Sequence, residues 1–558
     1  MLQYRVANSG IMPGAPPLKV TVWDAFGYYV YLPSICIYHD YKQLNWLPAV
    51  DKKYAVTGGD GYQAMKLDNG NYTFKYLGGV AILESPFFFI GHFIALHSSY
   101  PPDGFSPPYQ YALGFGVICY CILAVFLLRK VLLLYFQDLT TCITLLMVCL
   151  ATNFIQYAAV DNGQSHGYIF PLYVLVLYAT IKWHRKPAPG WAGLIGYLIG
   201  LGMICRPTEA IMLFIPLLWD THDKEAAKRK WLLVKQHKWH LALAAAGGLM
   251  GILPQLLYWK ATTGSFIFDV GSKWDFLNPH FRVLFGWEKG WFIYTPVTLF
   301  FIAGMFFMRQ FPFKKSVLWF CLLNVYIIIA WSEWRYGGSY STRALVQSYP
   351  LFALPMAAIT ERIGKTKWRW AFYVVCAYLL FVNLFQVNQY NKTVLHFDDM
   401  NRKYYGRIYL NPHPSPLDMS LLDNDEVLND EAAYHKHILS EKDSPFHVHF
   451  DSPSPYTLFQ SQPLGLSEQK RWLKVEAEVF SAGFWQSYLN LDLKCGDSVK
   501  HVRARLFNAI SPDRKENHYA FYVSIPAYLQ CDGFRLYITD AFTFDGDIHK
   551  IVITEFDK

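Results

Sequence analysis

The chain has 558 residues and a formal net charge of +8, but only 16% of its residues are charged, against about 25% in a typical soluble protein. The deficit of charge lies between about residues 109 and 390, and the sequence after residue 390 resembles an ordinary soluble domain. Most of the excess Lys and Arg flanks apolar runs, as the orientation of membrane segments requires, which argues against nucleic-acid binding.

Residues 1–108 are expected to form an extracytoplasmic first loop with interfacial helices. Residues 1–20 are too polar and too rich in Pro and Gly to span a bilayer, and they do not resemble a signal peptide. We therefore expect either that an upstream transmembrane helix is missing or that this region inserts unusually. The apolar segment 80–97 is interrupted by Glu84, Pro86 and His92, which predicts a helix at the outer interface. If it crosses the bilayer instead, the orientation of the first segment inverts.

Residues 109–390 are predicted to form a transmembrane helical domain of about nine to ten spans, because a span needs about 20 mostly apolar residues. The pair of segments around Arg206 is short and is expected to form a tight hairpin that does not fully cross. The candidate spans are 109–128, 139–158, 167–182, 191–205, 207–219, 239–259, 291–308, 315–332, 343–360 and 369–389.

Lys and Arg gather in alternate loops between these candidate spans. The loops after residues 128, 182, 219, 308 and 360 are basic, and all fall on one side if each candidate crosses once. Positive loops are retained in the cytoplasm, so that side is predicted to be cytoplasmic. The first loop, the Arg206 tip and everything after residue 390 are then extracytoplasmic.

Residues 391–445 are interpreted as a connector with some helix, and residues 446–558 as an extracytoplasmic β-sandwich. Six runs alternate with a period of two and are bounded by turn residues, as strands are: FHVHF, RWLKVEAEVF, SYLNLDL, YAFYVSI, FRLYIT and HKIVITEF. The ten Cys show no CxxC pair and no Cys/His ligand spacing. If the domain faces an oxidising compartment, Cys495 and Cys531 can form a disulfide, and their pairing is left open.

Several ionisable residues lie within or beside the predicted spans. A charge at bilayer depth costs about 3 kcal/mol or more, and such residues usually mark a site. Each also has a purely structural interpretation. Asp24 can cap the following helix, Arg206 can pair with Glu209 one turn later, and Lys289 can snorkel to the interface. Taken together, the cations suit a phosphate and the carboxylates suit proton abstraction. The set is Asp24, Asp161, His166, Arg206, Glu209, Lys289, Glu333, Arg335 and Arg343.

These residues resemble those of the GT-C-fold glycosyltransferases, the group that includes protein O-mannosyltransferases and the lipid A aminoarabinose transferase. The resemblance covers about residues 20–390. Asp24 in WDAFGYY falls where the family has its first-loop carboxylate, and Asp161 falls in the second acidic loop. The RPTE, KGWFIYTP and GGSYSTR segments are similar to pieces of bacterial, particularly Bacteroidetes-type, members. Family members begin with a transmembrane helix before the first-loop Asp, which this sequence does not show.

The resemblance implies a multi-pass protein of the bacterial inner membrane that takes a sugar from a polyprenyl-phosphate donor by inverting displacement. Asp24 is then the catalytic base, and Asp161 orients its partner or binds the acceptor. Substrate-binding roles fall to Arg206, Arg343, Lys289, His166, Glu209 and Tyr28.

The sequence leaves the partners of such an enzyme open. The acceptor is a protein, a lipid or a glycan, and membrane lipids surround the chain. No cofactor is expected. Some relatives bind a divalent metal through acids in these loops, but the sequence shows no metal-ligand cluster, so metal-independent catalysis is favoured. The alternative is a transporter or flippase for a lipid-linked saccharide, which should show internal repeats with paired broken helices.

Overall fold

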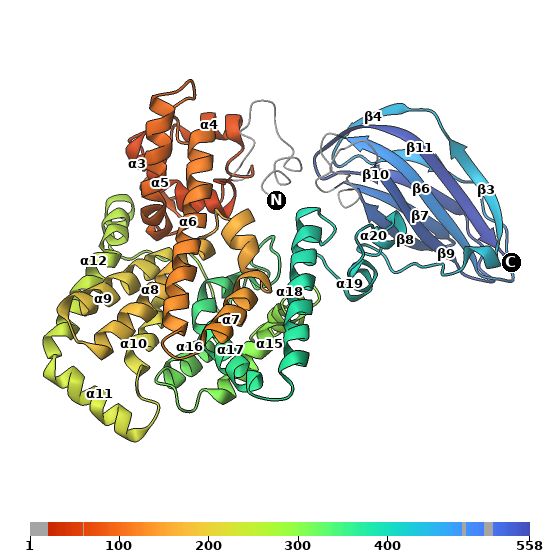
Figure 1. Cartoon of the computed structure of the whole chain (residues 1–558). Helices are drawn as coiled ribbons and strands as arrows, with labels where there is room; N and C mark the ends of the chain where they lie inside the picture. The colour runs from red at the N-terminus through yellow and green to blue at the C-terminus, as the bar shows by residue number, and fades with distance from the viewer. Residues whose placement is uncertain (1–19, 60, 482–486, 507–516) are drawn as a thin grey trace. The chain divides into compact units, whose positions relative to one another are not determined.

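The computed structural model describes residues 20–59, 61–481, 487–506 and 517–558 (Figure 1). Residues 1–19, on which the question of an upstream span turns, lie outside this range. The chain forms two compact units that divide between Val387 and Asn388, and each is described by itself. The first unit is helical and the second is mainly antiparallel β-sheet, as predicted.

The helical unit opens with short elements that carry many aromatic side chains. Tyr29, Phe74, Phe88 and Phe105 are fully buried in their shared core. This packing holds the first loop against α5 and α6 as part of the helical unit. The elements are α2 (Asp24–Tyr29), α3 (Tyr31–Cys36), α4 (Leu47–Tyr54), the hairpin β1 (Ala64–Lys66) and β2 (Tyr72–Phe74), α5 (Gly79–Leu96) and α6 (Pro107–Leu132).

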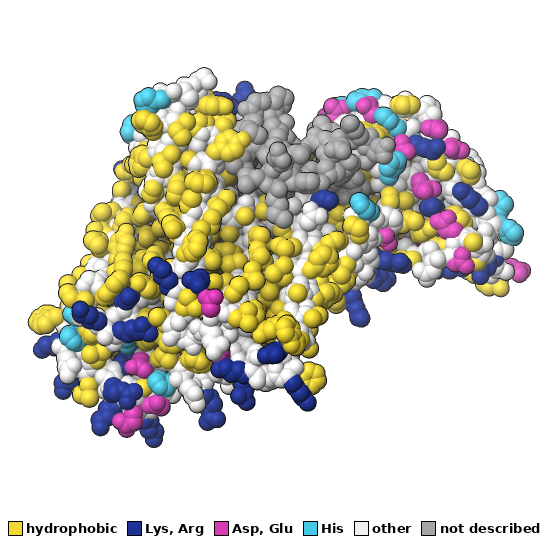
Figure 2. Space-filling view, in the orientation of Figure 1, with side chains coloured by type: hydrophobic (Ala, Val, Ile, Leu, Met, Phe, Trp, Pro, Cys, Tyr) yellow, Lys and Arg dark blue, Asp and Glu magenta, His cyan; other side chains and the backbone are white. Residues whose placement is uncertain are grey.

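Four helices of the described residues are long and apolar enough to cross a membrane: α5, α6, α12 (Lys238–Thr263) and α18 (Arg369–Asn391). Together they indicate a multi-pass membrane protein. Because α5 meets this requirement, it is a candidate for crossing the membrane as well as for the predicted helix at the outer interface. The orientation therefore stays a prediction. Figure 2 shows hydrophobic side chains over much of the visible face of the helical unit, with Lys and Arg gathered along the edge where α11 (Lys224–Gln236) lies.

The remaining predicted spans are shorter or broken, so the number of crossings also stays a prediction. The segment 291–308 is interrupted at Pro296, and the segment 343–360 starts with a 3₁₀ turn. The helices are α7 (Asp138–Leu150), η1 (Gln156–Val160), α8 (Ser165–Arg185), α9 (Pro189–Cys205), η2 (Pro207–Leu213), α10 (Phe214–Leu218), α13 (Arg282–Phe285), α14 (Trp291–Tyr294), α15 (Thr298–Gly304), η3 (Met305–Phe307), α16 (Lys314–Ile329), η4 (Arg343–Ser348) and α17 (Tyr349–Gly364).

Helices α9 and α12 run parallel with their backbones in direct contact. A Cβ atom on Gly196 would lie 1.8 Å from the Ala244 carbonyl oxygen, and one on Gly200 would lie 2.3 Å from that of Gly248. Small residues four apart allow this approach between helices in a membrane. The packing fixes the end of α9, and therefore the position of Arg206, which follows it.

The second unit contains two antiparallel sheets that enclose one apolar core. One sheet has the order β5–β10–β7–β8, and the other has the order β3–β11–β6–β9 with β4 also paired to β11. Cys495 and Cys531 form a disulfide. The strands are β3 (His435–Lys442), β4 (Phe446–Asp451), β5 (Tyr456–Gln460), β6 (Arg471–Ser481), β7 (Tyr488–Cys495), β8 (Ser498–Arg505), β9 (His518–Ile525), β10 (Gly533–Thr539) and β11 (Thr543–Asp557).

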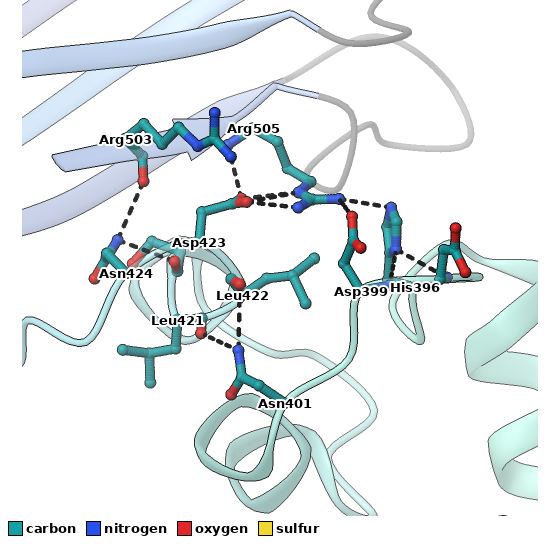
Figure 3. Close-up of polar contacts among 11 residues, drawn as sticks. His396, Asp399, Asn401, Leu421, Leu422, Asp423, Asn424, Arg503 and Arg505 are labelled. Atoms are coloured by element: carbon teal, nitrogen blue, oxygen red, sulfur yellow. Dashed lines mark hydrogen bonds and ion pairs between the residues drawn. The ribbon is translucent and has the colours of Figure 1, made fainter. Parts of the chain in front are cut away.

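The connector is shorter than the predicted 391–445, because β3 begins at His435. It contains α19 (Arg402–Ile408), α20 (Pro416–Ser420) and η5 (Glu431–Ala433). Arg505 of β8 fastens it to the sheet (Figure 3): its guanidinium donates to Asp423, with Nη2 at 2.5 Å from Oδ1, and its Nη1 lies 2.7 Å from His396 Nε2. The Asp423 side chain is only 2% exposed.

Candidate functional site

Asp24 is the first residue of α2 and receives three hydrogen bonds. The hydroxyls of Tyr62 and Tyr76 donate to Oδ1 at 2.7 and 2.6 Å, and Nη2 of Arg343 donates to Oδ2 at 2.5 Å. The Asp24 side chain makes no helix-capping hydrogen bond, so the capping interpretation is wrong. An ion pair between residues 319 positions apart thus joins the first loop to η4.

The Asp24 carboxylate is stabilised in its ionised form. Burial alone would raise the pKa of Asp24, but the positive charge of Arg343 and the hydrogen bonds from Tyr76 and Tyr62 together lower it to about 2. In this arrangement the carboxylate is charged at neutral pH, and three of its roughly four acceptor positions are occupied. Its capacity as a base therefore depends on what happens to the Arg343 contact.

Lys289 holds the loop that leads to Arg343. Its ammonium group donates to the backbone carbonyls of Arg335, at 2.7 Å, and of Gly337. Gly337 has a φ of +62°, and a Cβ atom there would lie 3.6 Å from Nη2 of Arg343. Lys289 is 5% exposed, so its contacts position the loop beside Arg343 rather than reach into solvent as a snorkelling side chain does.

A chain of buried hydrogen bonds links α8, η4 and η2. His166 Nδ1 lies 2.8 Å from Oε1 of Gln347, and the Gln347 amide donates to Oε1 of Glu209 at 3.1 Å. The Tyr173 hydroxyl donates to the second oxygen of Glu209. His166, Glu209 and Gln347 are each 2% exposed, which makes an unsatisfied polar group costly here.

Arg206 lies between α9 and η2, where Pro207 ends the helical hydrogen bonding. Among residues 20–59, 61–481, 487–506 and 517–558 it has no hydrogen-bond or ion-pair partner, so the expected pair with Glu209 does not form. Its charge nevertheless acts on Tyr28, His166 and Glu209. A guanidinium that is half-buried and not neutralised is suited to bind an anion.

Asp161 directly follows the π-helical turn η1. Its Oδ2 accepts a hydrogen bond from the Gln156 amide at 2.8 Å, and its backbone N–H donates to the Gln156 carbonyl. Such π-turns frequently occur at functional sites.

Seven of the eight predicted site residues are linked, and five of them form one electrostatic group. Asp24, Arg343 and Arg206 all act on the Tyr28 hydroxyl and on the His166 ring. Glu209 joins through Gln347, and Lys289 joins through the loop before Arg343.

Sequence reasoning missed Tyr62, Tyr76, Gln347 and Tyr173, which hold the carboxylates. Neutral side chains in an aromatic-rich sequence carry no signal that would have singled them out. In the part of the chain that the structure describes, no group of three or more His, Cys, Asp and Glu side chains is placed to hold a metal ion.

No protein-family model and no curated protein sequence matches the chain. Among solved structures, the chain is similar to ArnT from Cupriavidus metallidurans, with 12% identity and a TM-score of 0.38 over 70% of this chain and 66% of that one.

It is also similar to the oligosaccharyltransferase AglB from Archaeoglobus fulgidus in complex with an inhibitory peptide and a dolichol-phosphate. That similarity has 11% identity and a TM-score of 0.39, and it covers 72% of this chain and 56% of that one. The apo form of the Archaeoglobus fulgidus oligosaccharyltransferase gives 10% identity and a TM-score of 0.39 over 74% and 58%. In each case the chain spans less than two thirds of the length of the solved protein. At TM-scores below 0.5 these likenesses establish no activity.

Proposed function

We propose that the chain is a membrane glycosyltransferase of GT-C type, which moves a sugar from a polyprenyl-phosphate donor to a hydroxyl of an extracytoplasmic acceptor. The observation that carries the proposal is the convergence of Asp24, Arg343 and the unpaired Arg206 on Tyr28 and His166. A half-buried carboxylate paired with one guanidinium group, and a second guanidinium group that acts on the same two side chains, provide a proton acceptor and a phosphate site.

In the proposed reaction, the acceptor oxygen forms a bond to the anomeric carbon while the bond from that carbon to the phosphate oxygen breaks. The polyprenyl phosphate leaves with the bonding electron pair, and the acceptor proton passes to Asp24. A single displacement inverts the anomeric centre. Arg206 stabilises the phosphate because fixed cations in a water-poor site act more strongly than in bulk water.

The ion pair of Asp24 links donor binding to base strength. The donor phosphate competes with Asp24 for the Arg343 guanidinium. When Arg343 turns to the phosphate, the carboxylate loses its main counter-charge while burial remains, and the pKa of Asp24 rises. The base therefore becomes effective only when a donor is present.

The test separates phosphate binding from chemistry. In purified full-length protein in lipid nanodiscs, Arg206→Gln should weaken binding of undecaprenyl phosphate at least tenfold. Asp24→Asn should retain binding and lower transfer from a bound donor by about 10²–10⁴-fold. The exposed Arg129, which pairs with Asp138, provides the matched control: Arg129→Gln should change neither quantity.

Two results would overturn this proposal. Near-normal turnover in Asp24→Asn removes the carboxylate from the mechanism. Transfer of the intact lipid-linked saccharide across the bilayer, with no cleavage of its sugar–phosphate bond, would favour a transporter.

A further inference from the structure

In the row of buried hydrogen bonds that joins Tyr173, Glu209, Gln347 and His166, each bond has a defined donor and acceptor. Glu209 receives a hydrogen bond on each carboxylate oxygen, from the Tyr173 hydroxyl and from the Gln347 amide. The Gln347 side chain therefore turns its NH₂ group, which can only donate, toward Glu209. The Gln347 carbonyl oxygen then faces His166.

This direction fixes the tautomer of His166. The Gln347 carbonyl accepts, so His166 Nδ1 must carry the proton, and the neutral ring then has its lone pair on Nε2. The Tyr157 ring meets the imidazole edge-on at 5.5 Å and restrains its plane. Both guanidinium groups, Arg206 and Arg343, oppose a second proton on the ring.

Nε2 is thus a neutral hydrogen-bond acceptor on which both Arg206 and Arg343 act. Within the described residues, Nε2 of His166 makes no hydrogen bond. The ring lies in the field of the phosphate-binding candidate Arg206 and also of Asp24 with Arg343. If the proposed function holds, the sugar occupies the space between the phosphate and the base.

We infer that His166 Nε2 accepts a hydrogen bond from a hydroxyl group of the donor sugar. The inference rests on the proposed function and adds a substrate class to it: a sugar with a neutral hydroxyl at the contacted position. A protonated amino group at that position would also donate, but Arg206 and Arg343 repel its charge. A deoxy position would leave Nε2 unsatisfied, which buried acceptors tolerate poorly.

The experiment compares a donor with and without its sugar. Full-length protein in nanodiscs is titrated with undecaprenyl phosphate alone and with undecaprenyl phosphates that carry glucose, galactose, mannose or 4-amino-arabinose. His166→Phe should leave binding of undecaprenyl phosphate within about twofold of wild type. It should weaken binding of the preferred hydroxyl sugar about tenfold, the usual loss for one buried hydrogen bond.

His166→Gln is the matched variant, because its side-chain carbonyl can replace Nε2 as an acceptor, and it should recover most of the lost affinity. Gln347→Leu removes the carbonyl that holds the proton on Nδ1 of His166. It should therefore show the same sugar-specific loss of affinity as His166→Phe. A wild-type preference for the amino sugar over every neutral sugar would overturn the inference.

Three other outcomes would also overturn the inference. Equal losses for undecaprenyl phosphate and for the sugar donor would show that His166 only supports the fold. No loss for any sugar would show that Nε2 has no contact with the donor. If binding of undecaprenyl phosphate depends on Arg206 but no sugar adds affinity, the proposed phosphate site is supported and the proposed hydroxyl contact is wrong. Failure of undecaprenyl phosphate itself to bind would instead overturn the proposed function.

Discussion

The sequence identifies Asp24 as a candidate site residue but does not show which side chains bind its carboxylate. Its place before an aromatic segment identified it as a candidate, but the sequence did not show that Arg343, Tyr62 and Tyr76 would occupy both of its oxygens. Those partners come from a hairpin and from η4, and only tertiary packing brings them together. The same holds for Glu209, which is engaged by Tyr173 and Gln347 instead of the neighbouring Arg206.

The lowered pKa of Asp24 predicts a pH-dependent contribution to stability. The native pKa is about 2 and the ordinary value is 3.8, so the ionised group stabilises the fold above pH 3.8 and loses that effect as the pH falls through about 2. This difference corresponds to about 2 kcal/mol. The gap in unfolding free energy between wild type and Asp24→Asn should be constant above about pH 5 and should shrink toward pH 2.

Thermal unfolding of both proteins in detergent between pH 6 and pH 2.5 measures this gap. A gap that stays constant over the whole range would contradict the ion pair, because Asp24 would then take up its proton at the same pH in the native and the unfolded states.

At the scale of elements, the period-two runs predicted six strands, and the structure contains a strand at each, namely β4, β6, β7, β9, β10 and β11. Strands β3, β5 and β8 were missed. β3 is exposed along nearly its whole length, and six residues of β8 are intermediate or exposed with three of them Lys or Arg, so neither shows a clear apolar alternation. Edge strands of this kind are specified by pairing with their neighbours more than by their own sequence.

The close packing of α9 on α12 predicts a sharp difference between two glycines of one helix. Gly196→Ala places a Cβ atom against the Ala244 backbone and should destabilise the helical unit by about 1–3 kcal/mol. Gly190→Ala, where nothing lies within 4 Å, should be neutral or slightly stabilising.

Thermal melts of the two variants test this difference. Because α9 ends at Arg206, Gly196→Ala should also weaken undecaprenyl phosphate binding. Equal melting temperatures would show that the helices are not in backbone contact. The motif GLIGYLIGLG carries the small-residue spacing, so this contact could have been predicted from the sequence.

The contact between Asp423 and Arg505 is the corresponding feature of the β unit. Asp423→Ala removes the buried partner of Arg505 and leaves the guanidinium with the more exposed Asp399, so it should cost about 2–3 kcal/mol. Asp425, which is 81% exposed in its pair with Lys403, is the control, and Asp425→Ala should cost less than about 1 kcal/mol. We expect trypsin to cleave the connector faster in Asp423→Ala than in the wild type, and at the wild-type rate in Asp425→Ala. Equal cleavage rates in the two variants would contradict the role of the Asp423–Arg505 contact.

For the whole molecule, the composition and the alternation of apolar and basic segments were enough to predict a helical membrane unit followed by a β unit. The number of crossings could not be obtained in this way, because Pro296, Pro207 and the π-turn at Gln156–Val160 divide apolar stretches that read as continuous in the sequence. Those breaks release backbone groups, and bilayers tolerate them only where protein or water satisfies them.

The predicted orientation places the disulfide and the basic α11 on opposite sides of the membrane. In inverted and right-side-out vesicles, a membrane-impermeant thiol reagent should reach a cysteine introduced at Lys228 only from the cytoplasmic side. Without reductant, Cys495 and Cys531 should resist alkylation in both vesicle types, since they are bonded to each other. Labelling of the introduced cysteine from the outer side would show that the predicted topology is inverted.

The ion pair between Asp24 and Arg343 also has a consequence for biosynthesis. The ribosome adds Asp24 319 positions before its counter-charge, so most of the helical unit has been translated when Arg343 emerges. Until then the nascent polypeptide contains a carboxylate without its guanidinium. A product released before residue 343 therefore cannot form the ion pair that joins the first loop to η4.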